Sequence, residues 1–100
     1  MSTYETTTVE QLKARLDAGD APYLIDVRED EEVAAGMIPG AKHIRLGTLP
    51  ERLSEIPKDE EVIFICRSGA RSARACEYLS ELGFGRAVNM VGGMLAWNEL

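Results

Sequence analysis

The sequence predicts an α/β domain whose mainly parallel sheet is covered by helices on both faces. Strand-like segments alternate with helix-like segments along the chain, and short connections join them. The two clearest strands, Tyr23–Val27 and Val62–Ile65, are almost continuously apolar, which is typical of parallel strands buried on both sides. One hundred residues suffice for one hydrophobic core, so we expect a single domain over residues 1–100.

Five helical segments and two further short strands are expected around these two strands. The first helix begins with a capping box formed by Thr8 and Gln11, and it ends at Gly19. The other helical segments are Glu29–Ala35, Thr48–Pro57, a long one from about Gly69 to Gly83, and a short one around Leu95–Trp97. The remaining strands are expected at His43–Ile44 and Ala87–Met90.

The charge balance excludes some classes of partner. The net charge of −6 argues against nucleic acid and against an anionic membrane surface as the main partner. No apolar run approaches the length of a membrane span, and the first residues lack the basic and apolar regions of a secretory signal. We therefore expect a cytoplasmic protein. The local exception is a cluster of arginines, Arg67, Arg71 and Arg74, directly after Cys66.

Cys66 is the residue with the clearest chemical signal. It follows the strand Val62–Ile65 and precedes a helix, so it stands at the carboxyl end of a strand and next to a helix N-terminus. The residues from Arg67 to Ser72 are small, polar and basic, and a tight turn there can point successive backbone amides at the sulfur. The amides, with the guanidinium groups of Arg67 and Arg71, favour a thiolate, so Cys66 is predicted to be a nucleophile of low pKa.

The second cysteine, Cys76, is interpreted differently. It lies inside the predicted long helix, where it forms an apolar stripe with Ala73 and Leu79, so we expect it to pack in the core rather than to act as a resolving thiol. A disulfide between the two cysteines is not expected. With a single histidine, His43, and two separated cysteines, the sequence contains no spacing typical of a metal site, and it implies no cofactor.

Four segments together give the chain a family resemblance. They are Asp26-Val27-Arg28-Glu29, Gly36-Met37-Ile38-Pro39-Gly40-Ala41, Cys66-Arg67-Ser68-Gly69-Ala70-Arg71-Ser72 and Gly92-Gly93-Met94-Leu95-Ala96-Trp97. In this order and at these separations they resemble a single-domain rhodanese, of the rhodanese-like sulfurtransferase family, over nearly the whole chain. The resemblance implies a five-stranded, mainly parallel sheet flanked by helices on both faces. It also implies a ping-pong cycle in which Cys66 takes up a sulfur atom as a persulfide and passes it to an acceptor.

The resemblance also assigns roles to the residues around Cys66. The loop residues expected to bind the substrate are Arg67, Ser68, Gly69, Ala70, Arg71 and Ser72. Asp26 and Arg28 are expected to organise the fold near the site rather than to take part in the reaction. Basic loops in similar proteins go with thiosulfate, so we expect a small anionic sulfur donor. The expected acceptor is cyanide or a thiol, such as that of thioredoxin or another sulfur-carrier protein.

Two alternatives share some of these motifs. A protein-to-protein sulfur relay, or a non-catalytic rhodanese-like interaction module, would carry the same segments. A phosphatase or an arsenate reductase is disfavoured by loop length, because the related cell-cycle phosphatases have a Cys-x5-Arg loop, whereas Cys66 and Arg71 form Cys-x4-Arg. A tighter ring of amides suits a single sulfur atom better than a tetrahedral phosphate.

Overall fold

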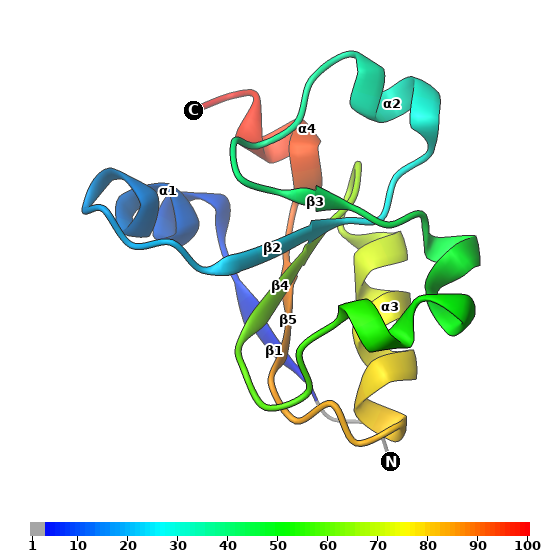
Figure 1. Ribbon diagram of the computed structural model, residues 1–100. Helices are drawn as coiled ribbons and strands as arrows, with labels where there is room; N and C mark the ends of the chain where they lie inside the picture. The colour runs from blue at the N-terminus through cyan, green and yellow to red at the C-terminus, as the bar shows by residue number, and fades with distance from the viewer. Residues whose placement is uncertain (1–3) are drawn as a thin grey trace.

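The computed structural model describes residues 4–100 and contains one five-stranded parallel sheet (Figure 1). The strand order is β1-β5-β4-β2-β3, and all four neighbouring pairs run parallel. The strands are β1 (Glu5–Thr7), β2 (Tyr23–Asp26), β3 (Lys42–His43), β4 (Val62–Ile65) and β5 (Ala87–Met90). The predicted α/β class, with five strands and a parallel sheet, is confirmed.

Helices cover both faces of this sheet, as expected. The α-helices are α1 (Val9–Asp17), α2 (Asp30–Ala34), α3 (Ala70–Glu81) and α4 (Gly93–Trp97), and the two 3₁₀ helices are η1 (Leu46–Glu51) and η2 (Leu53–Glu55). Figure 1 shows α3, η1 and η2 on one side of the sheet and α1 with α4 on the other. Alternate residues of β4 point to opposite faces of the sheet. Phe64 packs in the core against α3, whereas Ile63 and Ile65 pack toward α1 and α4.

The helix signals in the sequence predict the ends of α1 and α3 closely. Thr8 and Gln11 form the expected capping box, in which the Gln11 amide donates to Thr8 Oγ1 at 3.1 Å. At the end of α3, Gly83 has a φ of +89°, a left-handed conformation that strongly favours glycine. The predicted helix from about Gly69 to Gly83 is therefore confirmed, with Ala70 as its first residue.

Two expectations differ from the structure. The segment Thr48–Pro57 is not one helix that Thr48 caps; instead it forms part of η1 and η2, with Thr48 and Pro50 inside η1. Short 3₁₀ turns replace an α-helix here because few side chains of the segment are buried, so little packing energy favours a regular helix. The second difference is β1, an edge strand of three residues that no local pattern predicted and that forms by pairing with β5.

The parallel arrangement brings the carboxyl ends of neighbouring strands together. Asp26 ends β2 and lies in register with Ile65, which ends β4 and directly precedes Cys66. On the other side of β4, Phe64 is in register with Asn89 of β5. Residues that are far apart in the sequence therefore meet at one edge of the sheet. Among residues 4–100, none of the helices is both long and apolar enough to cross a membrane.

Candidate active site

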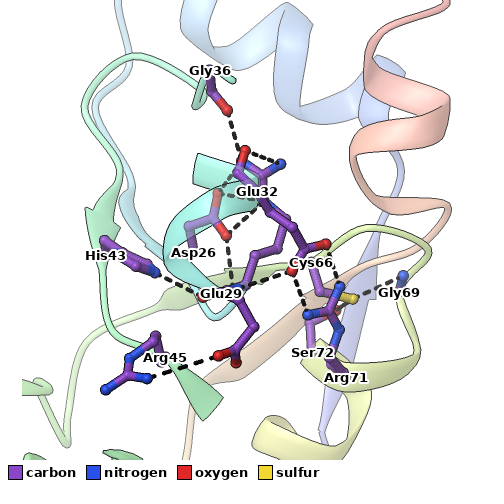
Figure 2. Close-up of polar contacts among 11 residues, drawn as sticks. Asp26, Glu29, Glu32, Gly36, His43, Arg45, Cys66, Gly69, Arg71 and Ser72 are labelled. Carbon is purple, nitrogen blue, oxygen red and sulfur yellow. Dashed lines mark hydrogen bonds and ion pairs between the residues drawn. The ribbon is translucent and has the colours of Figure 1, made fainter. Parts of the chain in front are cut away.

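Cys66 lies in a tight loop between β4 and α3, and its side chain is buried. Its sulfur accepts a hydrogen bond from the Gly69 amide at 3.0 Å and lies 3.3 Å from the Ser72 hydroxyl oxygen (Figure 2). Gly69 is the residue that turns the chain into α3, and its φ of +101° is accessible mainly to glycine. The loop therefore places a backbone amide and a hydroxyl around one sulfur atom.

These donors decide the acidity of Cys66. Burial raises the pKa of the thiol and is the largest single influence on it. The Ser72 hydroxyl and the backbone amides of Ser72, Gly69 and Ser68 act in the opposite direction, and together they lower the pKa of Cys66 below that of an ordinary cysteine. The arrangement therefore favours a thiolate, which is the nucleophilic form of the side chain.

The backbone at Cys66 is hydrogen-bonded to the start of α4. The Met94 amide donates to the Cys66 carbonyl at 2.8 Å, and the Leu95 amide donates to the Arg67 carbonyl at 3.0 Å. This approach requires a glycine at position 93, because a Cβ atom there would lie 2.4 Å from the Arg67 carbonyl oxygen. The glycine pair that precedes α4 thus allows close contact with the loop.

The arginines of the loop take different positions. Arg71 forms a two-pronged ion pair with Glu32 of α2, at 2.7 and 2.8 Å, and does not donate to the Cys66 sulfur (Figure 2). This pair lowers the pKa of Glu32 to about 2. The pair also raises the pKa of Arg71, and attraction between Arg71 and Cys66 raises it further. Arg67 is exposed. The nearest donors to the sulfur are thus amides and a hydroxyl, while Arg71 ties the loop to α2.

Asp26 and Arg28 form a buried ion pair at the end of β2. The Arg28 guanidinium donates to both carboxylate oxygens of Asp26, at 2.8 to 3.0 Å, and also to the Gly36 carbonyl at 2.7 Å. The Arg28 carbonyl in turn contacts Nε2 of His43 at 2.7 Å. None of these side chains bonds to the Cys66 sulfur within residues 4–100. Through Arg28, these contacts join the end of β2 to the carbonyls of Glu32 and Gly36. The organising role expected for Asp26 and Arg28 stays a prediction.

A hollow of about 420 Å³ opens beside the loop, between η1 and α3. Its apolar side is formed by Leu46, Leu49 and Pro50, and the α3 side contributes Arg71, Arg74 and Tyr78. Because Arg71 belongs both to this hollow and to the loop, the hollow borders the reactive segment. Its lining combines apolar groups with two guanidinium groups and the carboxylate of Glu29.

Two residues of the site were missed by the sequence analysis. Glu32 belongs to an acidic stretch whose partner stands far along the chain, so no local pattern identifies it. Asn89 is buried on β5, where its Nδ2 donates to the Gly69 carbonyl at 3.2 Å and its Oδ1 accepts from the Ser72 hydroxyl. A signal for Asn89 did exist, since it is a polar residue in the apolar strand Ala87–Met90.

Comparison with known proteins identifies relatives over most of the chain. The family model described as "Rhodanese-like domain" matches residues 8–100. YtwF of Bacillus subtilis is 58% identical over 86 residues, covering 86% of this chain and 82% of the relative. The sulfurtransferase of Allochromatium vinosum is 48% identical over 88 residues, covering 88% and 82%. The human thiosulfate:glutathione sulfurtransferase is 35% identical over 108 residues, covering 94% and 93%.

A solved structure has the same fold. The crystal structure of a rhodanese-like domain protein from Staphylococcus aureus superposes with a TM-score of 0.88 at 42% sequence identity. The match covers 93% of this chain and 90% of that protein. The sheet, the loop after β4 and the surrounding helices thus form an arrangement that is shared along almost the whole length.

Proposed function

Because this chain belongs to the rhodanese-like domain family, we propose that it is a sulfurtransferase that carries a sulfur atom on Cys66 as a persulfide. The observation that carries the proposal is the environment of Cys66, whose sulfur faces the Gly69 amide and the Ser72 hydroxyl at the start of α3. Both groups stabilise negative charge on the sulfur. A stabilised thiolate is what attack on a sulfur atom requires.

The first half of the cycle loads the sulfur atom. The Cys66 thiolate attacks the outer sulfur of thiosulfate, a new S–S bond forms, and the S–S bond of thiosulfate breaks. Sulfite leaves with the electron pair of the broken bond, so no proton has to be delivered to the leaving group. The negative charge then rests on the outer sulfur of the persulfide, next to the amides of the loop.

The second half of the cycle transfers the sulfur atom to an acceptor. A thiolate or cyanide attacks the outer sulfur, and the bond to Cys66 Sγ breaks. Cys66 leaves as a thiolate, and the same donors that lower its pKa make it a good leaving group. The products are a persulfide of the acceptor thiol, or thiocyanate. Acceptors consistent with this chemistry are small thiols, thioredoxin and other sulfur-carrier proteins.

Thiosulfate is the proposed donor for two reasons. One is chemical: thiosulfate is a dianion, and the hollow beside the loop contains two guanidinium groups, of Arg71 and Arg74, against one carboxylate, of Glu29. The other is the name of the human relative, a thiosulfate:glutathione sulfurtransferase. Because Glu32 neutralises much of the charge on Arg71, the more exposed Arg67 and Arg74 are the cations that an incoming anion meets first.

Mass spectrometry of the intact protein tests the proposal. After incubation with thiosulfate, the wild-type chain should gain about 32 Da, one sulfur atom, and cyanide should remove it. Cys76→Ala is the matched control and should gain the same mass, whereas Cys66→Ser should gain none. The proposal fails if the wild type gains no sulfur, or if Cys66→Ser gains as much. Slow turnover with cyanide but rapid transfer to a protein thiol would identify a relay rather than a small-molecule enzyme.

A further inference from the structure

Asn89 joins two parts of the Cys66 loop from the neighbouring strand. Its side chain is buried and lies on the face of β5 that α3 covers. It contacts the Gly69 carbonyl at 3.2 Å and the Ser72 hydroxyl, and both residues also bond to the Cys66 sulfur. Asn89 has no hydrogen bond to the sulfur itself, so it acts on the sulfur through Gly69 and Ser72.

The hydrogen-bonding partners fix the orientation of the Asn89 amide. The Gly69 carbonyl can only accept a hydrogen bond, so the group of Asn89 that faces it is the Nδ2 donor. The Oδ1 atom of Asn89 consequently faces Ser72. Because Oδ1 can only accept, the Ser72 hydroxyl is the donor in that contact.

Ser72 has one hydrogen for two acceptors. Its hydroxyl oxygen lies 3.3 Å from Cys66 Sγ and also within hydrogen-bond distance of Asn89 Oδ1. When Cys66 is protonated, its S–H can donate to the Ser72 oxygen while Ser72 donates to Asn89. When Cys66 is a thiolate, Ser72 must turn toward the sulfur, and Oδ1 of Asn89 loses its donor inside the protein. An unpaired buried acceptor is costly.

We propose that Asn89 is a positioning residue that competes with the Cys66 sulfur for the single hydrogen of Ser72. It holds the hydroxyl whenever Sγ carries no charge, in the thiol and, on the proposed function, in the persulfide, where the charge is on the outer sulfur. It releases the hydroxyl when the thiolate forms. Asn89 therefore makes the thiolate less favourable than Ser72 alone would make it.

The other charged and titratable groups around Cys66 do not take part in this competition. Arg71 of α3 attracts Cys66 through its charge, but it donates its hydrogen bonds to Glu32 of α2 and none to Ser72. Asp26 of β2 is paired with Arg28. Cys76, further along α3, lies in the same buried cluster as Cys66, and the charge of Cys66 raises the pKa of Cys76. Neither β5 nor α4 brings a charged residue to the sulfur among the described contacts. A change at Asn89 therefore reaches the sulfur through Ser72 or through Gly69, and the two routes shift the pKa of Cys66 in opposite directions.

The decisive experiment titrates the Cys66 thiolate by its ultraviolet absorbance in Asn89→Ala. The Cys76→Ala background is used, with a Cys66→Ser protein titrated in parallel to remove the tyrosine signal. Loss of the competing acceptor should lower the pKa of Cys66 by about one unit, a tenfold stronger acid. If Asn89 only supports the loop through Gly69, the substitution should weaken the amide contact to the sulfur. The pKa would then rise, and the proposal would be overturned.

A second set of variants separates the competition from general loosening. Ser72→Ala should raise the pKa of Cys66. Adding Asn89→Ala to Ser72→Ala should not lower that pKa, because no hydroxyl remains to be released. An equal fall with and without Ser72 contradicts the proposal. Asn89→Leu, which keeps the branched shape of the side chain, repeats the test if Asn89→Ala folds poorly. Ser80→Ala is the control within α3 and should leave the pKa of Cys66 unchanged, because the Ser80 hydroxyl donates to the Glu77 carbonyl. The readout needs no sulfur donor, so it stands apart from the outcome of the persulfide experiment.

Discussion

Cys66 and Cys76 are both buried, both belong to the core between the sheet and α3, and yet their environments give them opposite chemistry. Burial raises the pKa of each thiol, and for Cys76 it does so to about 12. Only Cys66 is surrounded by donors, which lower its pKa below the ordinary range. Burial alone therefore raises the pKa of a thiol, whereas hydrogen-bond donors around a buried thiol can bring its pKa below the ordinary value.

The position of each cysteine relative to α3 explains this difference. Cys66 precedes the helix, where the first backbone amides have no partner within the helix and can turn toward the sulfur. Cys76 lies in the middle of the helix, where the backbone amides are already bonded to the preceding turn. The same helix therefore provides hydrogen-bond donors for one sulfur and an apolar surface for the other.

The strongest way to break the comparison is to disturb the backbone beneath Cys66. In Gly93→Ala, the new Cβ would lie 2.4 Å from the Arg67 carbonyl oxygen and 2.6 Å from that of Cys66, at a φ of +57°. We expect a loss of about 3 kcal/mol in the free energy of unfolding, from overpacking and backbone strain. Chemical denaturation measures this loss.

Gly47→Ala is the matched control for this substitution. A Cβ at position 47 would have no atom within 4 Å, so its effect should stay below about 1 kcal/mol. The thiolate signal of Cys66 should weaken in Gly93→Ala only, since the loop must shift to make room. Equal stability of the two variants would show that α4 does not support the loop.

A smaller effect is expected from the ion pair that connects the loop to α2. The pKa of Glu32 is lowered to about 2 by Arg71, so the pair stabilises the fold above about pH 4.5, and this stabilisation is lost as the pH falls toward 2. Glu32→Gln should cost about 1 kcal/mol at neutral pH, because the pair is partly exposed to solvent. The difference from the wild type should shrink as the pH falls through that range.

Glu31→Gln provides the comparison for the pH series. Glu31 stands next to Glu32 on α2, is exposed, and has no ion pair within residues 4–100. Its substitution should leave stability almost unchanged at every pH. If Glu32→Gln costs the same at pH 3 as at pH 7, the charge of Glu32 is not what joins α2 to the loop.

The sequence predicts those parts of the fold and site that depend on local patterns. The run Val62–Ile65 identifies β4, and the glycines at either end of α3 mark that helix. Cys66 and its loop follow from the same local reasoning, because strand, loop and helix are contiguous. The edge strand Glu5–Thr7 has no such pattern, since it is mostly exposed and its structure comes from pairing with β5.

The contacts that complete the site depend on the tertiary fold. Arg71 was expected to favour the thiolate of Cys66. In the structure it attracts Cys66 through its charge, but its hydrogen bonds go to Glu32, which stands on a different element far along the chain. Asn89 and Ser72 are likewise brought together only when β5 packs beneath α3. A sequence pattern can locate a cysteine at the start of a helix, but the partners that adjust its acidity are determined by how the strands are ordered in the sheet.

The most direct test of this account is a pH titration of thiolate absorbance in the two single-cysteine proteins, Cys76→Ala and Cys66→Ser. The remaining Cys66 should ionise at a pH below that of an ordinary free cysteine. The remaining Cys76 should stay protonated until the pH approaches 12 or the protein unfolds. A Cys66 that ionises at or above the pH of a free cysteine would contradict the central claim that the loop donors overcome burial.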